Sequence, residues 1–148
     1  METSKYSLSE LDNTSFEWFT KVAAVRMLSE EYKEPRLVNQ KRIDELCHMM
    51  GQSKTAWVVK HNEIPIGALG ALPVPHVFNP DITCLAEIFW YVLPEYRNGR
   101  AASLLLNRFC EESKNYDESC FSLLVESEAV SKSLKKRGFM LKELGFKK

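Results

Sequence analysis

Apolar residues are concentrated in one stretch, residues 85–92, in which Glu87 is the only charged residue. A continuous apolar run rich in aromatic and β-branched side chains is typical of a buried strand. Pro94 ends the run, and residues 95–100 contain two arginines and an Asn-Gly pair, which favours a turn. Apolar residues then recur at helical spacing through residues 101–112. The pattern therefore predicts a strand, a basic turn and a helix, in that order.

Two further helices and a hairpin are predicted ahead of this unit. Helical spacing from residue 16 to about residue 32 indicates a first helix, whose wide apolar stripe favours packing on a sheet and against something else as well. A second helix is predicted between a cap at Asn39 and a stop at Gly51. Residues 55–60 and 66–72 are apolar runs joined by a polar connection of hairpin length, which predicts two antiparallel strands. Residues 1–12 predict no element.

The segment at residues 73–81 contains three prolines, so it is predicted to be a loop rather than a strand or helix. Its apolar Val77 and Phe78 leave three arrangements open. The loop packs against the chain's own core, closes over a substrate site, or is buried in a partner subunit.

The C-terminal third predicts three more elements. Residues 120–125 form an apolar run typical of a buried strand, and residues 126–138 predict a short helix with Gly138 as its C-terminal cap. Basic residues crowd the end of this helix, where they complement its negative end or contact a nucleotide phosphate. Residues 139–146 predict a last strand.

The length and charge of the chain restrict its class. Its 148 residues suit one domain, and its 20 basic and 20 acidic side chains balance, so no global charge favours nucleic acid or a membrane surface as partner. The first ten residues are polar, and no apolar stretch approaches the ~20 residues that a membrane span requires. We expect a cytoplasmic protein.

The cysteines and histidines predict no metal site. Cys47, Cys84, Cys110 and Cys120 are widely spaced and include no C-x-x-C pair, and the three histidines do not combine with them at metal-ligand spacing. We interpret the cysteines as small buried hydrophobic residues in a reducing compartment.

The turn before the central helix carries the strongest chemical signal. A helix N-terminus presents unpaired backbone N–H groups and the positive end of the helix dipole. Arg97 and Arg100 add two charges beside it. This combination favours an anion, above all a phosphate.

At this turn the residues VLPEYRNGRAA (92–102) resemble the acyl-CoA-binding motif V-x-P-x-x-[QR]-x-x-G-x-[GA] of the GNAT N-acetyltransferase superfamily. Arg97 falls on the [QR] position and Ala102 on the last one. Arg100 stands where the family has its first glycine, and Gly99 comes one place early. A second match, KRGF (136–139), resembles the family's ending near a Gly-Phe pair.

The resemblance implies a mixed α/β domain with a GNAT-like fold, a central and mostly antiparallel sheet and about four helices. It implies an acetyl-CoA-dependent N-acetyltransferase whose acceptor is a primary amine of a small molecule or a protein. The resemblance also implies that the thioester carbonyl and the pantetheine of acetyl-CoA contact the backbone of Val92 and Leu93. This backbone is expected to be exposed because Pro94 separates the strand from its neighbour. The expected cofactor-binding residues are Val92, Leu93, Arg97, Asn98, Gly99, Arg100, Ala101 and Ala102.

The catalytic groups are less well marked. Glu87 is the only ionisable residue in its strand, so burial would raise its pKa towards that of a useful base, and the resemblance places the family's glutamate base here. The alternative is a structural glutamate that pairs with a basic residue. Family members often carry a tyrosine acid where this chain has Leu134, so Tyr91 is the substitute candidate for an acid, with Tyr96 as a second. A binding module of the same fold, without turnover, remains the alternative function.

Assembly is predicted from the sheet edge. The ten residues after Gly138 suffice for one strand, whereas the family commonly has two there, so one edge stays open. A twofold partner would cover that edge together with the apolar stripe and the 73–81 loop. We expect a homodimer; the competing arrangement is a monomer whose charged terminal residues protect the edge.

Overall fold

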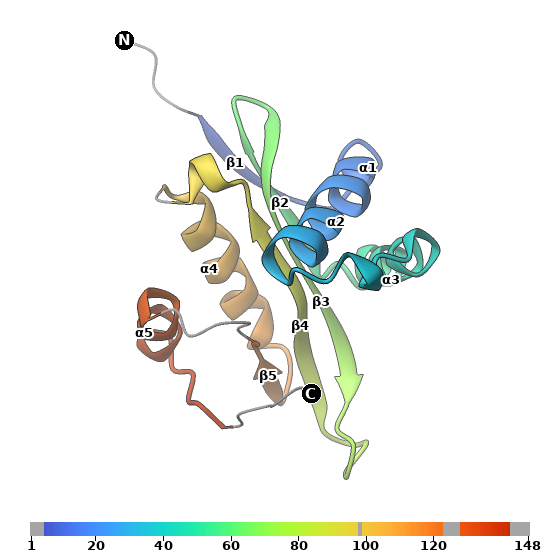
Figure 1. The fold of residues 1–148 in the computed structure, drawn as a ribbon. Coiled ribbons are helices and arrows are strands. Elements are labelled where there is room, and N and C mark those ends of the chain that lie inside the picture. The colour runs from blue at the N-terminus through green and yellow to red at the C-terminus, as the bar shows by residue number, and fades with distance from the viewer. Residues whose placement is uncertain (1–4, 98, 123–127, 143–148) are drawn as a thin grey trace.

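A computed structural model describes residues 5–97, 99–122 and 128–142 of the chain (Figure 1). Its centre is a five-stranded sheet in the order β1-β2-β3-β4-β5. Neighbouring strands are antiparallel except β4 and β5, which are parallel. The sheet confirms the predicted mixed α/β class and its mostly antiparallel pairing. The strands are β1 (Tyr6–Glu10), β2 (Ala56–His61), β3 (Ile64–Pro75), β4 (Thr83–Val92) and β5 (Glu118–Cys120).

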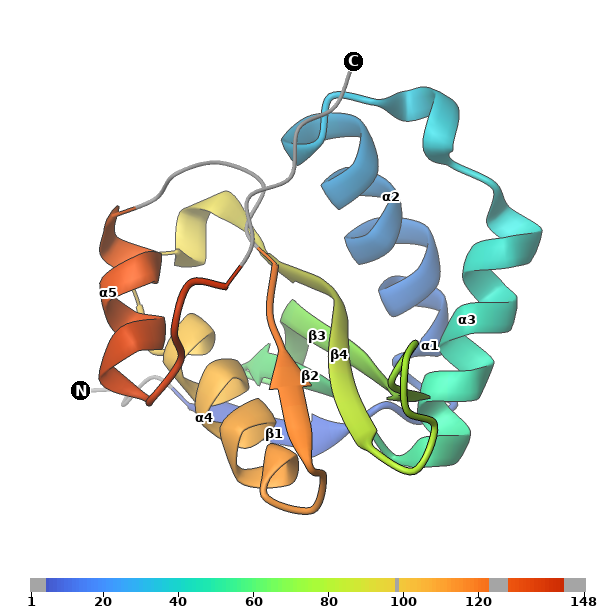
Figure 2. The same ribbon diagram turned by 90° about the horizontal axis from the view of Figure 1, so that it is seen from below.

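Helices cover both faces of this sheet (Figure 2). One face carries a helix over residues 16–31, built from α1 (Phe16–Trp18), a π-helical stretch (Phe19–Ala23), α2 (Ala24–Arg26) and a second π-helical stretch (Met27–Glu31). The same face carries α3 (Gln40–Ser53), and the other carries α4 (Ala101–Ser113) with α5 (Glu128–Lys136) beside it. The described part of the chain thus has the four predicted helices, and none is long and apolar enough to cross a bilayer.

Each face of the sheet has its own core. Phe19 of helix 16–31, Met50 of α3 and Phe89 of β4 belong to the first core. Trp57 of β2 and Phe109 of α4 belong to the second. The apolar side chains at the edges of the stripe on helix 16–31 also pack against the first core, so they are partly buried within this chain. The stripe therefore supplies less free surface for a partner than the sequence suggested.

A β-bulge in β4 decides which of its residues face each core. Glu87 pairs with Ala71 and Phe89 with Gly70, so Ile88 is an extra residue on β4. Strict alternation would put Leu85 and Phe89 on one face, yet Leu85 lies in the α4-side core and Phe89 in the other. After Glu87, the bulge therefore reverses which residues of β4 point to each face of the sheet.

The hairpin is confirmed, but the prediction that residues 73–81 form no strand is wrong for the first three of them. Pro73 and Pro75 belong to β3 and pair with β4. Along a strand, every second backbone N–H points to the same side, so the nitrogens of Pro73 and Pro75 point the same way as that of Ala71. The Ala71 N–H points away from β4 and donates to the carbonyl of Thr55, the residue before β2 begins. Beyond this point β3 has no β2 residue to pair with on that side, so a proline there removes no hydrogen bond of the sheet. Only the tip of the segment is a loop.

One helix boundary and one missed strand correct the N-terminal predictions. Asn39 caps α3 as predicted, accepting a hydrogen bond from the Arg42 N–H at 3.0 Å. The helix does not stop at Gly51, because Lys54, at φ 59°, supplies the left-handed residue that ends it. Residues 6–10 form the edge strand β1, where the alternation of Tyr6 and Leu8 with polar residues is the signal that the prediction missed.

The C-terminal predictions are confirmed in part. Gly138 ends α5 with φ 92°, and the Phe139 N–H donates to the Leu134 carbonyl at 3.1 Å. The strand expected over 120–125 is described only to residue 122, and its pairing runs over Glu118–Cys120. The last strand is wrong for residues 139–142, which carry no strand; the rest of that prediction lies outside the described residues. Phe139 instead stacks on Phe109.

Candidate active site

The strands β4 and β5 are paired only over the first part of β4 and then separate. Their pairing runs from Cys84–Glu118 to Ala86–Cys120, whereas β4 continues to Val92. The separation thus begins well before Pro94, where the sequence analysis placed it. A cavity of about 370 Å³ opens past the last pair. Its lining residues are Met27, Glu31, Tyr32, Glu87, Trp90, Tyr91, Val92, Arg97, Ala102, Ser122 and Val130.

Glu87 is the half-buried acid of this cavity. Burial raises the pKa of its carboxyl from 4.5 to about 8, and the backbone N–H of Ser122 moves that pKa the other way. No basic group contributes to the shift, which distinguishes this carboxyl from a glutamate paired with an arginine or lysine. The charge of Glu87 also helps burial to raise the pKa of Tyr32 across the cavity. The arrangement provides a carboxyl that titrates close to neutral pH.

Tyr91 lies between the cavity and the end of helix 16–31. Its side chain is buried, and its hydroxyl donates to a carboxylate oxygen of Glu30 at 3.4 Å. The guanidinium groups of Arg26 and Arg97 approach its ring, with centroid distances of 5.9 and 5.4 Å. Burial raises the pKa of the Tyr91 phenol, and the two arginines oppose that effect. The Tyr91 side chain is therefore held in place by charged neighbours.

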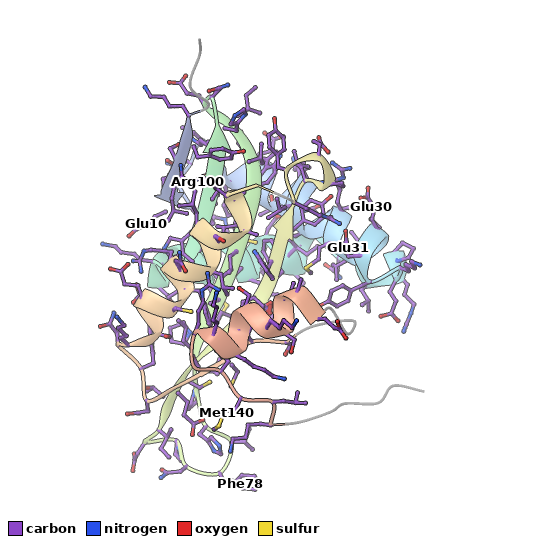
Figure 3. All side chains as sticks on the ribbon, turned by 90° about the vertical axis from the view of Figure 1, so that its left-hand side faces the viewer. Glu10, Glu30, Glu31, Phe78, Arg100 and Met140 are labelled. Atoms are coloured by element: carbon purple, nitrogen blue, oxygen red, sulfur yellow. The ribbon has the colours of Figure 1, made fainter. Side chains whose placement is uncertain are left out.

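Arg97 makes two bonds inside this site. Its Nε donates to the Val92 carbonyl at 2.8 Å, and its guanidinium forms an ion pair with Glu31. The pair links the basic turn to the C-terminal end of helix 16–31, where Glu30 and Glu31 lie (Figure 3). Sequence reasoning missed both glutamates because they belong to an exposed helix end 66 residues away from Arg97 in the chain.

The other predicted cofactor residues lie around the start of α4. Leu93 directs its N–H into the sheet, to the Ile66 carbonyl at 2.8 Å. Ala101 is fully buried, whereas Ala102 lines the cavity. Asn98 lies outside the described residues. Two members of the motif turn towards β1 instead: the Arg100 guanidinium lies 6.0 Å from the Tyr6 ring, and a Cβ at Gly99 would meet the Tyr6 hydroxyl at 3.2 Å.

A second, larger hollow of about 840 Å³ lies between α4 and α5. Arg137 spans it, donating to Asn107 of α4 at 2.9 Å and to the Ser133 carbonyl at 3.0 Å. Lys132 and Lys136 line the same hollow, so its wall is basic. The basic run at the end of α5 thus faces the helix whose N-terminus carries the predicted phosphate site.

The model of the acetyltransferase (GNAT) family matches residues 12–146. This chain belongs to the GNAT family. The match covers both motifs identified in the sequence and runs through every element except β1. No curated protein matches the sequence.

Solved structures share the GNAT fold across nearly the whole chain. A predicted acetyltransferase from Clostridium acetobutylicum with acetyl-CoA is 19% identical, with 97% of this chain and 95% of that chain covered and a TM-score of 0.74. The aminoglycoside N-acetyltransferase AAC(6')-Iy in complex with CoA is 16% identical, with 99% and 97% covered and a TM-score of 0.69. Arabidopsis thaliana Naa50 with a bisubstrate analogue is 16% identical, with 93% and 85% covered and a TM-score of 0.69. At these identities the likeness shows the fold.

A second departure from the family pattern, besides Arg100 in the motif, lies in α5. Leu134, which replaces the tyrosine common in the family, is a buried core residue of α5. A leucine donates no proton, so any acid must come from another element. Among the residues that the structure describes, Tyr91 and Tyr32 are the phenols that line the cavity, and no group of three metal-ligating side chains is found.

Proposed function

We propose that this GNAT domain transfers the acetyl group of acetyl-CoA to a primary amine of a small molecule or a protein. The observation that carries the proposal is the carboxyl of Glu87, with a pKa of about 8, inside a cavity that opens where β4 and β5 separate. A base whose pKa lies near neutral takes a proton from an amine efficiently at physiological pH.

The described residues also fit the cofactor. Acetyl-CoA supplies the acetyl group as a thioester. The gap between β4 and β5 offers an extended slot, and the start of α4 offers backbone N–H groups and a helix dipole to a diphosphate. The basic hollow between α4 and α5 adjoins that helix and suits the nucleotide's phosphate. Ala102 of α4 and Val130 of α5 line the cavity, and Ser103 and Ala129 line the hollow, so the two adjoin near the starts of both helices, as a long, anionic ligand requires.

The chemistry divides between two sides of the cavity. Glu87 accepts the proton of the acceptor ammonium, so that the neutral amine attacks the thioester carbonyl. The carbon–sulfur bond then breaks and the thiolate leaves, taking a proton from Tyr91 or from water. The nitrogen of the new amide gives its extra proton to the tyrosinate or hydroxide that remains. A thiol's ordinary pKa is about 8.5, so departure does not require a strong acid. We place this activity in the cytosol, where acetyl-CoA and free thiols coexist.

The acceptor would approach from the side of helix 16–31. Met27, Glu31 and Tyr32 bring this helix end to the cavity. π-Helical stretches such as Met27–Glu31 are frequent at functional sites. The related structures include an aminoglycoside acetyltransferase and Naa50 with a peptide-bearing analogue, so both classes of amine are candidates.

A binding module without turnover is the second candidate, favoured by Leu134 at the usual tyrosine position. Two measurements test these proposals. Acetyl-CoA should raise the melting temperature with the logarithm of its concentration, because it binds the folded state. A panel of amines should then yield free CoA with at least one acceptor. Absence of the thermal shift contradicts both functions, whereas a shift without CoA release favours the binding module.

A further inference from the structure

The fold brings together two cysteines that are far apart in the sequence. Cys84 begins the buried part of β4, and Cys120 ends β5. In the parallel pairing, Cys84 lies opposite Glu118 and Cys120 opposite Ala86, so the two cysteines share one face of the sheet. Their sulfur atoms are 3.1 Å apart. Their spacing in the sequence indicates two unconnected buried residues, and this interpretation is wrong for Cys120, which is exposed.

We propose that Cys84 and Cys120 are a redox pair that forms a reversible intramolecular disulfide on reaction with a low-molecular-weight disulfide. A disulfide bond is about 2.05 Å long, so the sulfurs need to approach by roughly one ångström. Both strands are held in the same sheet, which keeps the two sulfurs close. Neither cysteine lines the proposed acetyl-transfer cavity, and the inference does not depend on that activity.

Exposure assigns the order of the two steps. Cys120 is reached first: its thiolate attacks one sulfur of the small disulfide, that S–S bond breaks, and one thiolate leaves. Cys84, only 5% exposed, then loses its proton to solvent and attacks the Cys120 sulfur, releasing the second thiolate. Two protein thiols are oxidised by two electrons, and the small disulfide is reduced to two thiols.

The surroundings of Cys84 make it a slow resolving thiol. Burial, helped by the Cys120 sulfur, raises the pKa of Cys84 to about 12. Glu118, opposite Cys84, acts in the same direction, and no cation is among the causes of the shift. The second step is therefore slow at neutral pH and faster at alkaline pH, where more of the Cys84 thiol is ionised.

The position of the pair gives the disulfide a structural consequence. Cys120 lies in the last described pair of β4 and β5, where the cavity begins. Two residues later, Ser122 directs its N–H to Glu87. A Cys84–Cys120 bond closes a loop that contains the whole cofactor motif and α4, so it should stabilise the fold by restricting the unfolded chain. It also holds β5 against β4 at the base of the slot.

Tryptic digestion identifies the linkage without ambiguity. Cleavage after lysine and arginine puts Cys84 in peptide 61–97, Cys120 in 115–132, Cys47 in 43–54 and Cys110 in 109–114. The reduced full-length protein is incubated with oxidised glutathione at pH 8, alkylated in denaturant and digested without reductant. We expect two of the four thiols to be lost, a cross-linked 61–97/115–132 peptide, a higher melting temperature, and full reversal by dithiothreitol.

Variants give the matched controls. Cys84→Ala should leave glutathione trapped on peptide 115–132, and Cys120→Ala should abolish the reaction of both cysteines. Cys110→Ala removes a cysteine of α4 outside the pair and should form the cross-link as the wild type does. Retention of all four thiols, a stable mixed disulfide on wild-type peptide 115–132 with 61–97 free, or a disulfide between two chains would each overturn the proposal.

Discussion

Glu87 combines a charge with an apolar strand, and two consequences follow at the scale of this one residue. If it is the base, Glu87→Gln should lower kcat by about 10²-fold or more, the usual contribution of general-base catalysis. The acidic limb of the pH–rate profile, expected near pH 8 in the free enzyme, should vanish. Acetyl-CoA affinity should stay close to wild type. Normal turnover in the variant would make Glu87 structural.

The second consequence concerns stability. Between pH 4.5 and about 8 the folded state keeps a proton on Glu87 that the unfolded state has released. The free energy of unfolding should therefore fall as pH rises through this window, and level off above it. Urea denaturation at pH 6 and pH 9 measures the change. Glu87→Gln should reduce the pH dependence, whereas Glu10→Gln, on an exposed residue of β1, should leave it intact.

The ion pair of Arg97 and Glu31 makes a third prediction at this scale. Both side chains are more than a third exposed, so the pair contributes at most about 1 kcal/mol. If Arg97 must leave Glu31 to reach the diphosphate, Glu31→Gln should tighten acetyl-CoA binding by about two- to fivefold. Glu30→Gln is the matched control, because Glu30 pairs with Arg26. Calorimetry that shows weaker binding in Glu31→Gln would mean that Arg97 acts from its present position.

At the scale of elements, a glycine inside a helix and a glycine just after one should respond oppositely to substitution by alanine. Gly51 lies inside α3, where an added Cβ would touch nothing within 4 Å, so Gly51→Ala should stabilise by about 0.5–1 kcal/mol. Gly138 ends α5 at φ 92°, so Gly138→Ala should destabilise by about 1 kcal/mol. Thermal unfolding of the two variants checks both signs. Equal shifts would mean that the end of α5 does not require the left-handed conformation.

At the scale of the whole molecule, the tip of the β3–β4 hairpin is the main candidate for a subunit contact. Val77 and Phe78 are each 91% exposed, which excludes packing against the chain's own core. Phe78 lies at the far end of the molecule from Glu30 and Glu31, so the tip does not cover the cavity (Figure 3). Two adjacent exposed apolar side chains at the tip of a hairpin favour a partner. Burial in a twofold partner is the remaining arrangement of the three.

We therefore expect a homodimer that buries this tip. Light scattering over a dilution series from micromolar concentration should give twice the mass of one 17.1 kDa chain. Phe78→Asp should shift the equilibrium to the monomer, while Ile64→Asp, an exposed apolar residue at the other end of β3, should not. A mass near 17.1 kDa at all concentrations contradicts the dimer.

Several features of this protein could be predicted from its sequence because they depend on local or periodic signals. The apolar run of β4, the helix at residues 101–112, the Asn39 cap and the Gly138 cap each follow from the chemistry of neighbouring residues. The GNAT motif at residues 92–102 could be recognised for the same reason, because its residues are neighbours in the sequence. Glu87 could be proposed as a functional residue because a single charge in an otherwise apolar strand calls for an explanation.

The tertiary structure decided what depends on residues distant in the sequence. The bulge at Ile88, the edge position that admits Pro73 and Pro75, and the ion pair of Arg97 with Glu31 all require partners from other elements. The 3.1 Å approach of Cys84 and Cys120 likewise follows from the parallel pairing of β4 with β5. Local patterns determine which element a segment forms, but burial and pairing between elements determine which side chains meet.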